Sequence, residues 1–238
     1  MNDQLILKFP EHRAYKKEDF YVSPSNQEAY DFINSWPKWI RRIVNIFGPS
    51  GSGKSHLASI LKMKTKCLEI SPEKLNENVI SEFKTNEALI IENFNEKISE
   101  KLLFSIWNIA HQDNKYFLIN SVKPISSYKF KLPDLTSRAK STLIIGIKLP
   151  SDDLISAIIA KNFSDKQIMI EEKHIDYIIK RIDRSYEKIS QFILILDRYS
   201  LKKGSPFGLK LIKEVLKMIK IFKKESHCIN IELIIVQK

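Results

Sequence analysis

The sequence has 238 residues, of which 43% are hydrophobic and 28% are charged, and these proportions suit one or two globular domains with a sizeable core. It has no run of about 18 or more apolar residues and no signal-peptide pattern, so we expect neither a membrane span nor secretion. Cys67 and Cys228 are the only cysteines and show no metal-ligand spacing, which favours reduced thiols in a cytoplasmic protein.

The formal net charge of +11 has two interpretations. A basic protein can bind nucleic acid, but most of the 39 basic residues are lysines that are spread along the whole chain. This distribution favours a compositional bias, with lysines solvating the surface, over a dedicated nucleic-acid-binding face. The sequence shows no zinc-finger, RNA-binding or clear helix-turn-helix pattern.

The first strong pattern in chain order is the apolar run Ile43–Phe47, which is followed by a glycine-rich loop and a helix-like stretch at 56–62. The loop fits the phosphate-binding pattern G-x-x-x-x-G-K-[ST], in which glycines let backbone N–H groups wrap a phosphate at a helix N-terminus. In this pattern Lys54 reaches the β- and γ-phosphates and the Ser55 hydroxyl binds Mg²⁺. The predicted nucleotide-binding residues are Gly48, Pro49, Ser50, Gly51, Ser52, Gly53, Lys54, Ser55 and His56.

Four more short apolar runs follow, at 66–70, 88–92, 116–120 and 142–147, with amphipathic stretches between them, most clearly at 99–111. Nearly continuous runs of Ile, Leu and Phe are typical of strands that are buried on both faces. The alternation of strands and helices therefore predicts an α/β fold, with a parallel five-stranded sheet between two layers of helices.

The strand signals stop after Pro150. Helical patterns at 152–161, 171–182, 186–199 and 209–222 predict a small all-helical second domain. The apolar tail at 229–236 is a further strand candidate without an assigned role.

Glu92 ends the apolar run at 88–92 and is followed by Asn93. A carboxylate at the end of a neighbouring strand is a natural Mg²⁺ partner beside Ser55, although it could also merely cap the strand. Hydrolysis needs a group that polarises the attacking water, usually a carboxylate at the next position, and Asn93 cannot take a proton. We therefore expect weak or absent intrinsic hydrolysis.

Four further residues are candidates for phosphate recognition. Asn120 ends a predicted strand and could face the γ-phosphate or a water, or simply start a turn. Arg138 precedes the last predicted strand, and an arginine in a lysine-rich chain indicates either bidentate phosphate recognition or a plain surface residue. Arg181 and Arg184 flank a turn in the second domain, and either could fold over the nucleotide.

Together these residues resemble the AAA+ ATPases, and the finer resemblance is to the initiator clade, which contains the replication initiator DnaA and its regulatory relative Hda. The phosphate loop, the run at 88–93, Asn120, the Leu-Thr-Ser-Arg box at 135–138 and the helical lid carry it, with similar segments at 18–26, 35–39 and 121–124. The resemblance covers roughly residues 4 to 215. It implies that Asn120 is sensor 1, that Arg138 is a trans arginine finger and that Arg184, rather than Arg181, is sensor 2. One departure is that Glu92 stands where the family usually has Asp, which bears on Mg²⁺ binding.

The resemblance also assigns a role to the start of the chain. DnaA has further N-terminal and C-terminal domains that find no match here, whereas the Hda-like proteins have a shorter form and begin with a peptide that binds the DNA polymerase sliding clamp. The residues that match this peptide are Gln4, Leu5, Leu7 and Phe9. We therefore expect an N-terminal arm at 1–22, an AAA+ domain at 23–150 and a helical lid with a tail at 151–238.

The function implied by the resemblance is regulatory inactivation of DnaA. Bound to the sliding clamp, and through it indirectly to DNA, the protein would contact ATP-bound DnaA, and Arg138 would stimulate hydrolysis of that ATP. Its own nucleotide, ADP or ATP with Mg²⁺, would act as a structural switch. The alternatives are a DNA-binding or loading adaptor of the same class and an autonomous ATPase, and the sequence leaves open whether copies of the chain assemble.

Overall fold

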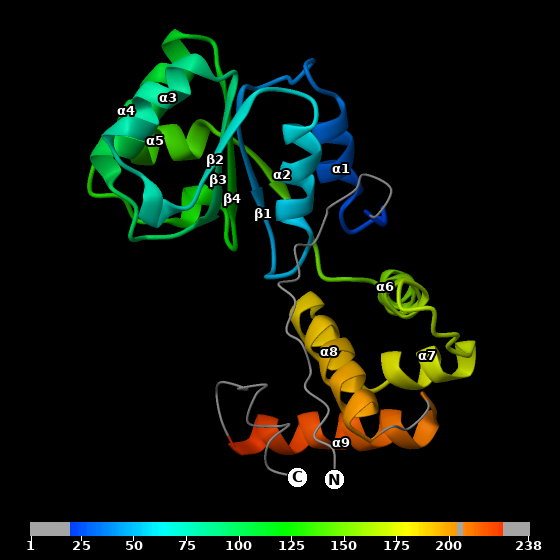
Figure 1. The fold of residues 1–238 in the computed structure, drawn as a ribbon. Coiled ribbons are helices and arrows are strands. Elements are labelled where there is room, and N and C mark those ends of the chain that lie inside the picture. Colours follow the sequence, from blue (N-terminus) through cyan, green and yellow to red (C-terminus); the bar gives the residue numbers. More distant parts are fainter. Residues whose placement is uncertain (1–19, 204–206, 226–238) are drawn as a thin grey trace.

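The computed structural model describes residues 20–203 and 207–225, and these form two parts (Figure 1). The first part is an α/β unit that ends with the last strand of a sheet. The second part contains four helices and lies beside the edge of the sheet at which the glycine-rich phosphate loop, residues 48–53, is found (Figure 1). None of the described helices combines the length and the apolarity that crossing a membrane requires.

The sheet has five parallel strands in the order β2-β3-β4-β1-β5, which confirms the predicted α/β class. Its strands are β1 (Ile43–Phe47), β2 (Cys67–Ile70), β3 (Ala88–Phe94), β4 (Tyr116–Ser121) and β5 (Leu143–Gly146). The five strands predicted between residues 43 and 147 are present, with their ends shifted by at most two residues, and the strand candidate at 229–236 lies outside the described residues. The side chains of β1 and β4 are almost all buried, as expected for central strands covered on both faces.

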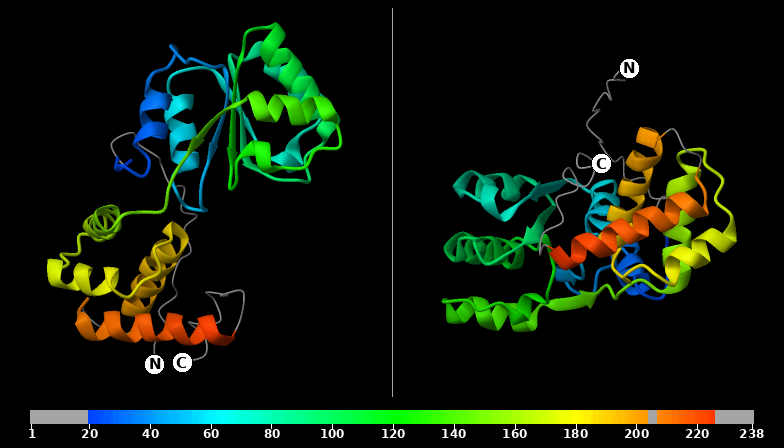
Figure 2. Two further views of the ribbon diagram at one scale, coloured as in Figure 1. Left: turned by 180° about the vertical axis from the view of Figure 1, so that it is seen from behind. Right: turned by 90° about the horizontal axis from the view of Figure 1, so that it is seen from below.

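Helices cover both faces of this sheet (Figures 1 and 2). On one face lie α1 (Gln27–Asn34) and α2 (Lys54–Lys62), and their apolar side chains form one core cluster with β1. On the other face lie α3 (Glu77–Thr85), α4 (Glu100–Gln112) and α5 (Pro133–Ser141), which form a second cluster. Short 3₁₀ turns lie at Pro72–Lys74 and Ile125–Ser127.

Lysine side chains cover the C-terminal carbonyl groups of two of these helices. Lys115 donates to the carbonyl oxygens of Lys84 and Asn86 at the end of α3, at 2.8 and 2.7 Å. Lys64 donates to the carbonyl oxygen and the side-chain oxygen of Asn34 at the end of α1, at 3.3 and 3.0 Å. A cation at this end satisfies free carbonyl groups and offsets the negative end of the helix dipole.

The second part consists of α6 (Asp152–Ser164), α7 (Glu172–Ile179), α8 (Tyr186–Lys203) and α9 (Leu209–Glu225). Its apolar side chains form a core cluster of their own, separate from the two clusters on the sheet. Ser151 caps α6, because its side-chain oxygen accepts from the backbone N–H of Leu154 at 3.3 Å. The helix predicted at 171–182 is shorter in the structure, because the chain turns after Ile179. Arg181 and Arg184 therefore lie in the loop before α8.

A buried asparagine joins the two central strands. Asn45 of β1 is fully buried, and its amide donates to the carbonyl oxygen of Ile119 and to the Ser121 hydroxyl, both at 2.8 Å. Its oxygen accepts from the backbone N–H of Ile125 at 2.8 Å. The side chain is thus satisfied, and it fixes the turn that follows β4 against β1.

We predict that Asn45→Ala destabilises the protein strongly, because it leaves the Ile125 N–H and the Ile119 carbonyl oxygen without these partners inside the core. The expected loss is about 2–4 kcal/mol of unfolding free energy, measured by urea denaturation. Asn78→Ala, on the exposed side of α3, is the matched control and should cost less than about 0.5 kcal/mol. Equal losses in the two variants would contradict a structural role for the Asn45 bonds.

Candidate functional site

The phosphate loop lies between the end of β1 and the start of α2. Two of its glycines, Gly51 and Gly53, have φ angles of 77° and 92°, in the left-handed region that favours glycine. Space is also restricted at Gly48, where a Cβ atom would lie 2.8 Å from the carbonyl oxygen of Ile147. This backbone turns the chain sharply, so that the first N–H groups of α2 are directed at the loop, as in an anion-binding helix start.

Lys54, the first residue of α2, is folded back over the loop. Its ammonium group donates to the carbonyl oxygens of Gly48 and Pro49, both at 2.8 Å. Burial lowers the pKa of Lys54 from its ordinary value, and the nearby Glu92 carboxylate acts in the opposite direction. The loop thus holds a buried cation at the position where a phosphate group would bind.

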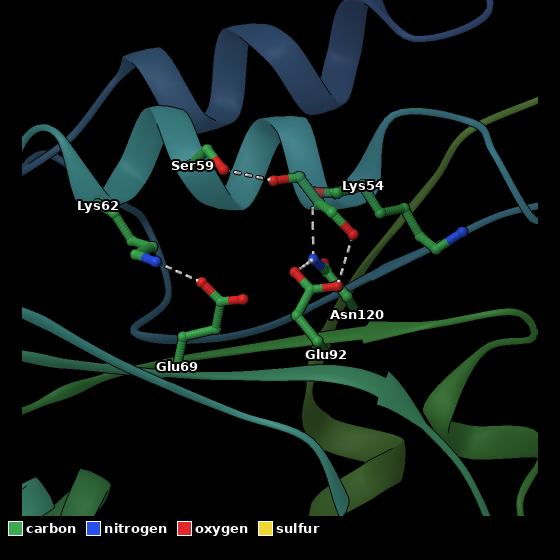
Figure 3. Close-up of polar contacts among 7 residues, drawn as sticks. Lys54, Ser59, Lys62, Glu69, Glu92 and Asn120 are labelled. Atoms are coloured by element: carbon green, nitrogen blue, oxygen red, sulfur yellow. Dashed lines mark hydrogen bonds and ion pairs between the residues drawn. The ribbon is translucent and has the colours of Figure 1, made fainter. Parts of the chain in front are cut away.

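Glu92 links the loop to the neighbouring strands (Figure 3). One carboxylate oxygen accepts from the Ser55 hydroxyl at 2.9 Å, and the other accepts from the side-chain amide of Asn120 at 2.7 Å. The same amide donates to the carbonyl oxygen of Lys54 at 3.2 Å. The structure therefore brings together three predicted site residues, from α2, β3 and β4.

The oxygen atoms of this network are suitable ligands for a hydrated Mg²⁺ ion. The Asn120 oxygen Oδ1 is fully buried and has no hydrogen-bond partner, so the side chain bonded to Glu92 carries an unused acceptor. Ser55 and Glu92 add oxygen ligands of the type that Mg²⁺ prefers. The described residues contain no cluster of three or more His, Cys, Asp or Glu side chains that could hold a metal ion, and Mg²⁺ sites of nucleotide-binding proteins commonly complete their shell with phosphates and waters.

Burial raises the pKa of Glu92 above its ordinary value. The hydrogen bonds from Ser55 and Asn120 act against this effect, and the nearby Glu69 carboxylate adds to it. Glu69 itself pairs with Lys62 at 2.6 Å on the exposed side of the same region (Figure 3). The charged form of Glu92 is therefore costly until a cation arrives beside it.

Asn93 lies next to this network at an irregular point of β3. Its φ angle is 53°, and the pairing of β3 with β4 shifts register between Ile91 and Phe94. The predicted strand ended at Glu92, whereas the observed strand continues past this bulge to Phe94. The bulge turns the exposed Asn93 side chain into the cavity beside the phosphate loop.

Two adjoining cavities lie between the α/β part and the helical part. The larger, of about 470 Å³, borders the phosphate loop, and its wall includes Asn93, Tyr186 and Ser190. The smaller, of about 350 Å³, has mostly apolar and aromatic walls from Phe20, His56 and the α6 helix. The Phe20 ring meets the His56 ring edge-on at 5.3 Å and lies close to Gly53, where a Cβ atom would be 2.8 Å from it. The lining of the larger cavity suits phosphates and that of the smaller one suits a planar base. We refer to them as the phosphate cavity and the base cavity.

Arg138 lies away from both cavities. It belongs to α5, on the face of the sheet opposite to α2, and lines neither cavity. Its guanidinium group lies 4.8 Å from the centre of the Phe104 ring and donates to the Asn108 oxygen at 2.6 Å. The side chain is half-buried against α4, so the protein holds it in a defined place.

The two lid arginines make their contacts with other residues of the lid. Arg184 pairs with Asp152 at 2.9 Å, and Arg181 lies 3.7 Å from the centre of the Tyr177 ring. Neither lines a cavity, so the sensor role of Arg184 stays a prediction. The residues Gln4, Leu5, Leu7 and Phe9 lie outside the described part of the chain.

The structure adds one site residue that the sequence did not single out. Tyr186, the first residue of α8, lines both cavities and is almost fully buried. A tyrosine that starts a helix gives no recognisable sequence signal for such a position. Only the packing of the second part against the phosphate loop reveals it.

We predict that Glu92→Gln raises the melting temperature of the nucleotide-free protein at pH 7 without Mg²⁺. The pKa of Glu92 is higher in the folded state than in the unfolded state, so the folded state binds more protons. The free energy of unfolding therefore falls as the pH rises from the unfolded-state pKa through the raised folded-state pKa. The amide keeps the shape and removes this loss. Thermal melts between pH 4 and pH 8 measure it.

The control for this prediction is Glu82→Gln, which removes an exposed carboxylate on α3 that contacts neither Ser55 nor Asn120. This variant should lack the increase in melting temperature. A lower melting temperature for Glu92→Gln than for the wild type at pH 7 would show that the Glu92 charge stabilises the nucleotide-free fold.

Sequence comparison finds replication initiators, although no family model matches the chain. The chromosomal replication initiator protein DnaA of Buchnera aphidicola is 24% identical over 262 residues, which cover 98% of this chain and 60% of that protein. DnaA of Campylobacter jejuni is 27% identical over 248 residues, covering 91% of this chain and 55% of that protein. The chain thus spans a little over half the length of these two relatives.

Structural comparison finds the same group. Domain III of DnaA from Thermotoga maritima superposes with a TM-score of 0.71 at 21% identity, covering 88% of this chain and 98% of that one. AMPPCP-bound DnaA from Aquifex aeolicus gives 0.67 at 17% identity, covering 88% and 72%. The chain therefore has the AAA+ fold, and its sequence is similar to that of DnaA over nearly its whole length.

Proposed function

We propose that this protein is a nucleotide-binding regulator of replication initiation that acts from the sliding clamp and stimulates hydrolysis of the ATP bound to DnaA. The observation that carries the proposal is the position of Arg138. Arg138 is half-buried, is held by Phe104 and Asn108 and lines neither of the chain's own cavities, which supports a role toward a nucleotide on another molecule.

The chemistry follows from charge. When water attacks the γ-phosphorus of ATP bound to the partner, the bond to the bridging oxygen breaks and negative charge accumulates on the transferred group and on ADP. A guanidinium that donates two N–H groups to these oxygens stabilises this charge more than that of the ground state. Arg138 would supply these donors from outside the partner's site.

The chain's own nucleotide has a different role in this proposal. Lys54 and the first N–H groups of α2 would hold the phosphates, and Ser55, Glu92 and Asn120 would hold Mg²⁺, which neutralises phosphate charge when it is bound. Asn93 is the group that faces the phosphate cavity at the position of the catalytic carboxylate, and an amide cannot accept a proton from water. A retained ADP or ATP would stabilise the fold by mass action, because it binds only the native state.

The clamp partner rests on the sequence. Gln4 would hydrogen-bond at the edge of a pocket on the clamp, and Leu7 and Phe9 would fill it, as an extended peptide that becomes ordered on binding. DNA would then be reached through the clamp. Arg138 and the chain's own nucleotide cavities lie on different surfaces. A contact between Arg138 of one copy and the nucleotide of another could therefore also join copies of this chain.

The net positive charge supports the alternative of a direct DNA-binding adaptor less well. Lys64 and Lys115 serve helix ends, and Lys62 and Lys123 pair with carboxylates. Part of the basic charge therefore has a structural use. A salt titration of DNA binding separates the two functions, because a dedicated basic face gives an affinity that falls steeply with salt.

We predict that Arg138→Ala abolishes the stimulation of ATP hydrolysis by DnaA in the presence of clamp-loaded DNA. Loss of an arginine finger should lower the stimulated rate by at least about 100-fold. Lys140→Ala, which removes an exposed cation two residues away on α5, is the matched control and should retain full stimulation. The assay follows phosphate release from DnaA preloaded with ATP.

Two outcomes of this assay would overturn the proposal. One is the absence of stimulation by the wild-type protein, and the other is equal stimulation by the wild type and Arg138→Ala. A variant with both Gln4→Ala and Leu7→Ala tests the clamp contact in the same assay, since it should fail to bind immobilised clamp and lose the stimulation that depends on loaded clamp.

We predict that Asn93→Asp increases the intrinsic ATP turnover of the isolated protein by about 10-fold or more, because it restores a proton acceptor beside the phosphate cavity. Aspartate tolerates the positive φ angle at this position, so the bulge should persist. Asn78→Asp, at an exposed position of α3 that lines neither cavity, is the control. Unchanged turnover in Asn93→Asp, or rapid turnover in the wild type, would refute the role assigned to Asn93.

A further inference from the structure

Tyr186 is the point at which the helical part touches the phosphate loop. A Cβ atom placed on Gly51 would lie 3.2 Å from the Cβ atom of Tyr186 and 3.4 Å from the backbone nitrogen of Glu187. These distances are at or below ordinary van der Waals contact, so the start of α8 packs directly on the left-handed turn of the loop. A displacement of Gly51 would therefore be passed to the first turn of α8.

The hydroxyl end of the same side chain joins two other segments. It donates to the carbonyl oxygen of Lys148, in the connection between β5 and α6, at 3.2 Å. It also lies 3.4 Å from the Ser25 hydroxyl, next to Asn26, which lines the base cavity. Lys148 and Ser25 are themselves joined by a backbone hydrogen bond of 2.9 Å. One side chain thus touches the phosphate loop, the wall of the base cavity and the connection to the lid.

The architecture makes this contact consequential. The four lid helices form a core cluster separate from both clusters of the sheet, so the lid can turn as one body about the connection at 147–151. On α8, the side chains of Ile189, Phe192 and Leu196 belong to the lid core, while Tyr186 and Ser190 line the phosphate cavity. A tilt at the start of α8 therefore moves the whole lid.

The lid arginines do not provide this connection. Arg184 is paired with Asp152 inside the lid, and Arg181 lies over Tyr177. Among the described arginines none lines either cavity. The contact between nucleotide site and lid that the structure does show runs through an aromatic side chain.

We infer that Tyr186 is the positioning residue that couples nucleotide occupancy of the phosphate loop to the orientation of the helical lid. The inference rests on the nucleotide binding proposed above and adds to it the route by which the lid responds. A bound diphosphate fixes the loop around Gly51, the loop fixes the Tyr186 body, and the Tyr186 hydroxyl fixes Ser25 and Lys148. These contacts are present in the structure, and in this inference a bound nucleotide stabilises them, which favours one orientation of the lid.

Hydrogen exchange of the full-length protein, with and without saturating ADP, tests this inference. In the wild type, ADP should slow exchange by about tenfold or more in peptides covering the phosphate loop, the connection at 147–151 and the start of α8. In Tyr186→Ala, protection of the phosphate loop should remain while protection of the connection and of α8 is lost. Tyr186→Phe keeps the contact with Gly51 but removes both hydroxyl contacts, so it should lose protection mainly at 147–151. Tyr177→Phe, a lid tyrosine that lines neither cavity, should behave as the wild type.

Two results for Tyr186→Ala would overturn the inference. One is protection of the lid equal to that of the wild type, and the other is loss of protection at the phosphate loop itself, which would make Tyr186 a binding residue. If this variant does not fold, Tyr186→Phe decides: reduced protection at 147–151 supports the coupling, and unchanged protection refutes it. Absence of ADP protection in the wild type would refute nucleotide binding, while a failure of DnaA stimulation leaves this readout untouched.

Discussion

The site depends on the two hydrogen bonds that the Glu92 carboxylate accepts. Parallel strands end at one edge of a sheet, and here the ends of β3 and β4 meet the start of α2, which follows β1, so that a serine, a carboxylate and an amide come into contact. Without a metal ion, the carboxylate is stabilised by the hydrogen bonds from Ser55 and Asn120 and by the nearby charge of Lys54. These side-chain hydrogen bonds therefore hold the site together, and a phosphate with its metal ion could replace them without a change in the backbone.

Much of this could be predicted from the sequence, because the determinants are local. The spacing of Gly48, Gly53 and Lys54 defines a loop whose geometry depends on neighbouring residues only, and continuous apolar runs mark the strands. Glu92 and Asn120 were found by their place at strand ends, since parallel strands must meet at a common edge. Asn45 gave no such signal, because the bonds that satisfy it come from residues more than seventy positions away.

The remaining features could not be predicted, because they arise from the packing of distant segments. The bulge at Asn93 depends on a register shift between β3 and β4, and no pattern in the run at 88–94 indicates it. In the lid, the family resemblance favours Arg184 over Arg181 as the residue that reaches the nucleotide. The ion pair with Asp152 and the stacking on Tyr177 instead engage both side chains locally, and a tyrosine takes the place beside the loop.

The lysines that cover helix ends change how the surface charge of this protein is understood. At the ends of α1 and α3, the positive charges of Lys64 and Lys115 lie against carbonyl groups that carry partial negative charge. A polyanion that approaches the ends of these two helices meets a positive potential that the carbonyl groups already partly cancel. Acetylation of these two lysines would accordingly weaken the helix termini more than it would weaken attraction to nucleic acid.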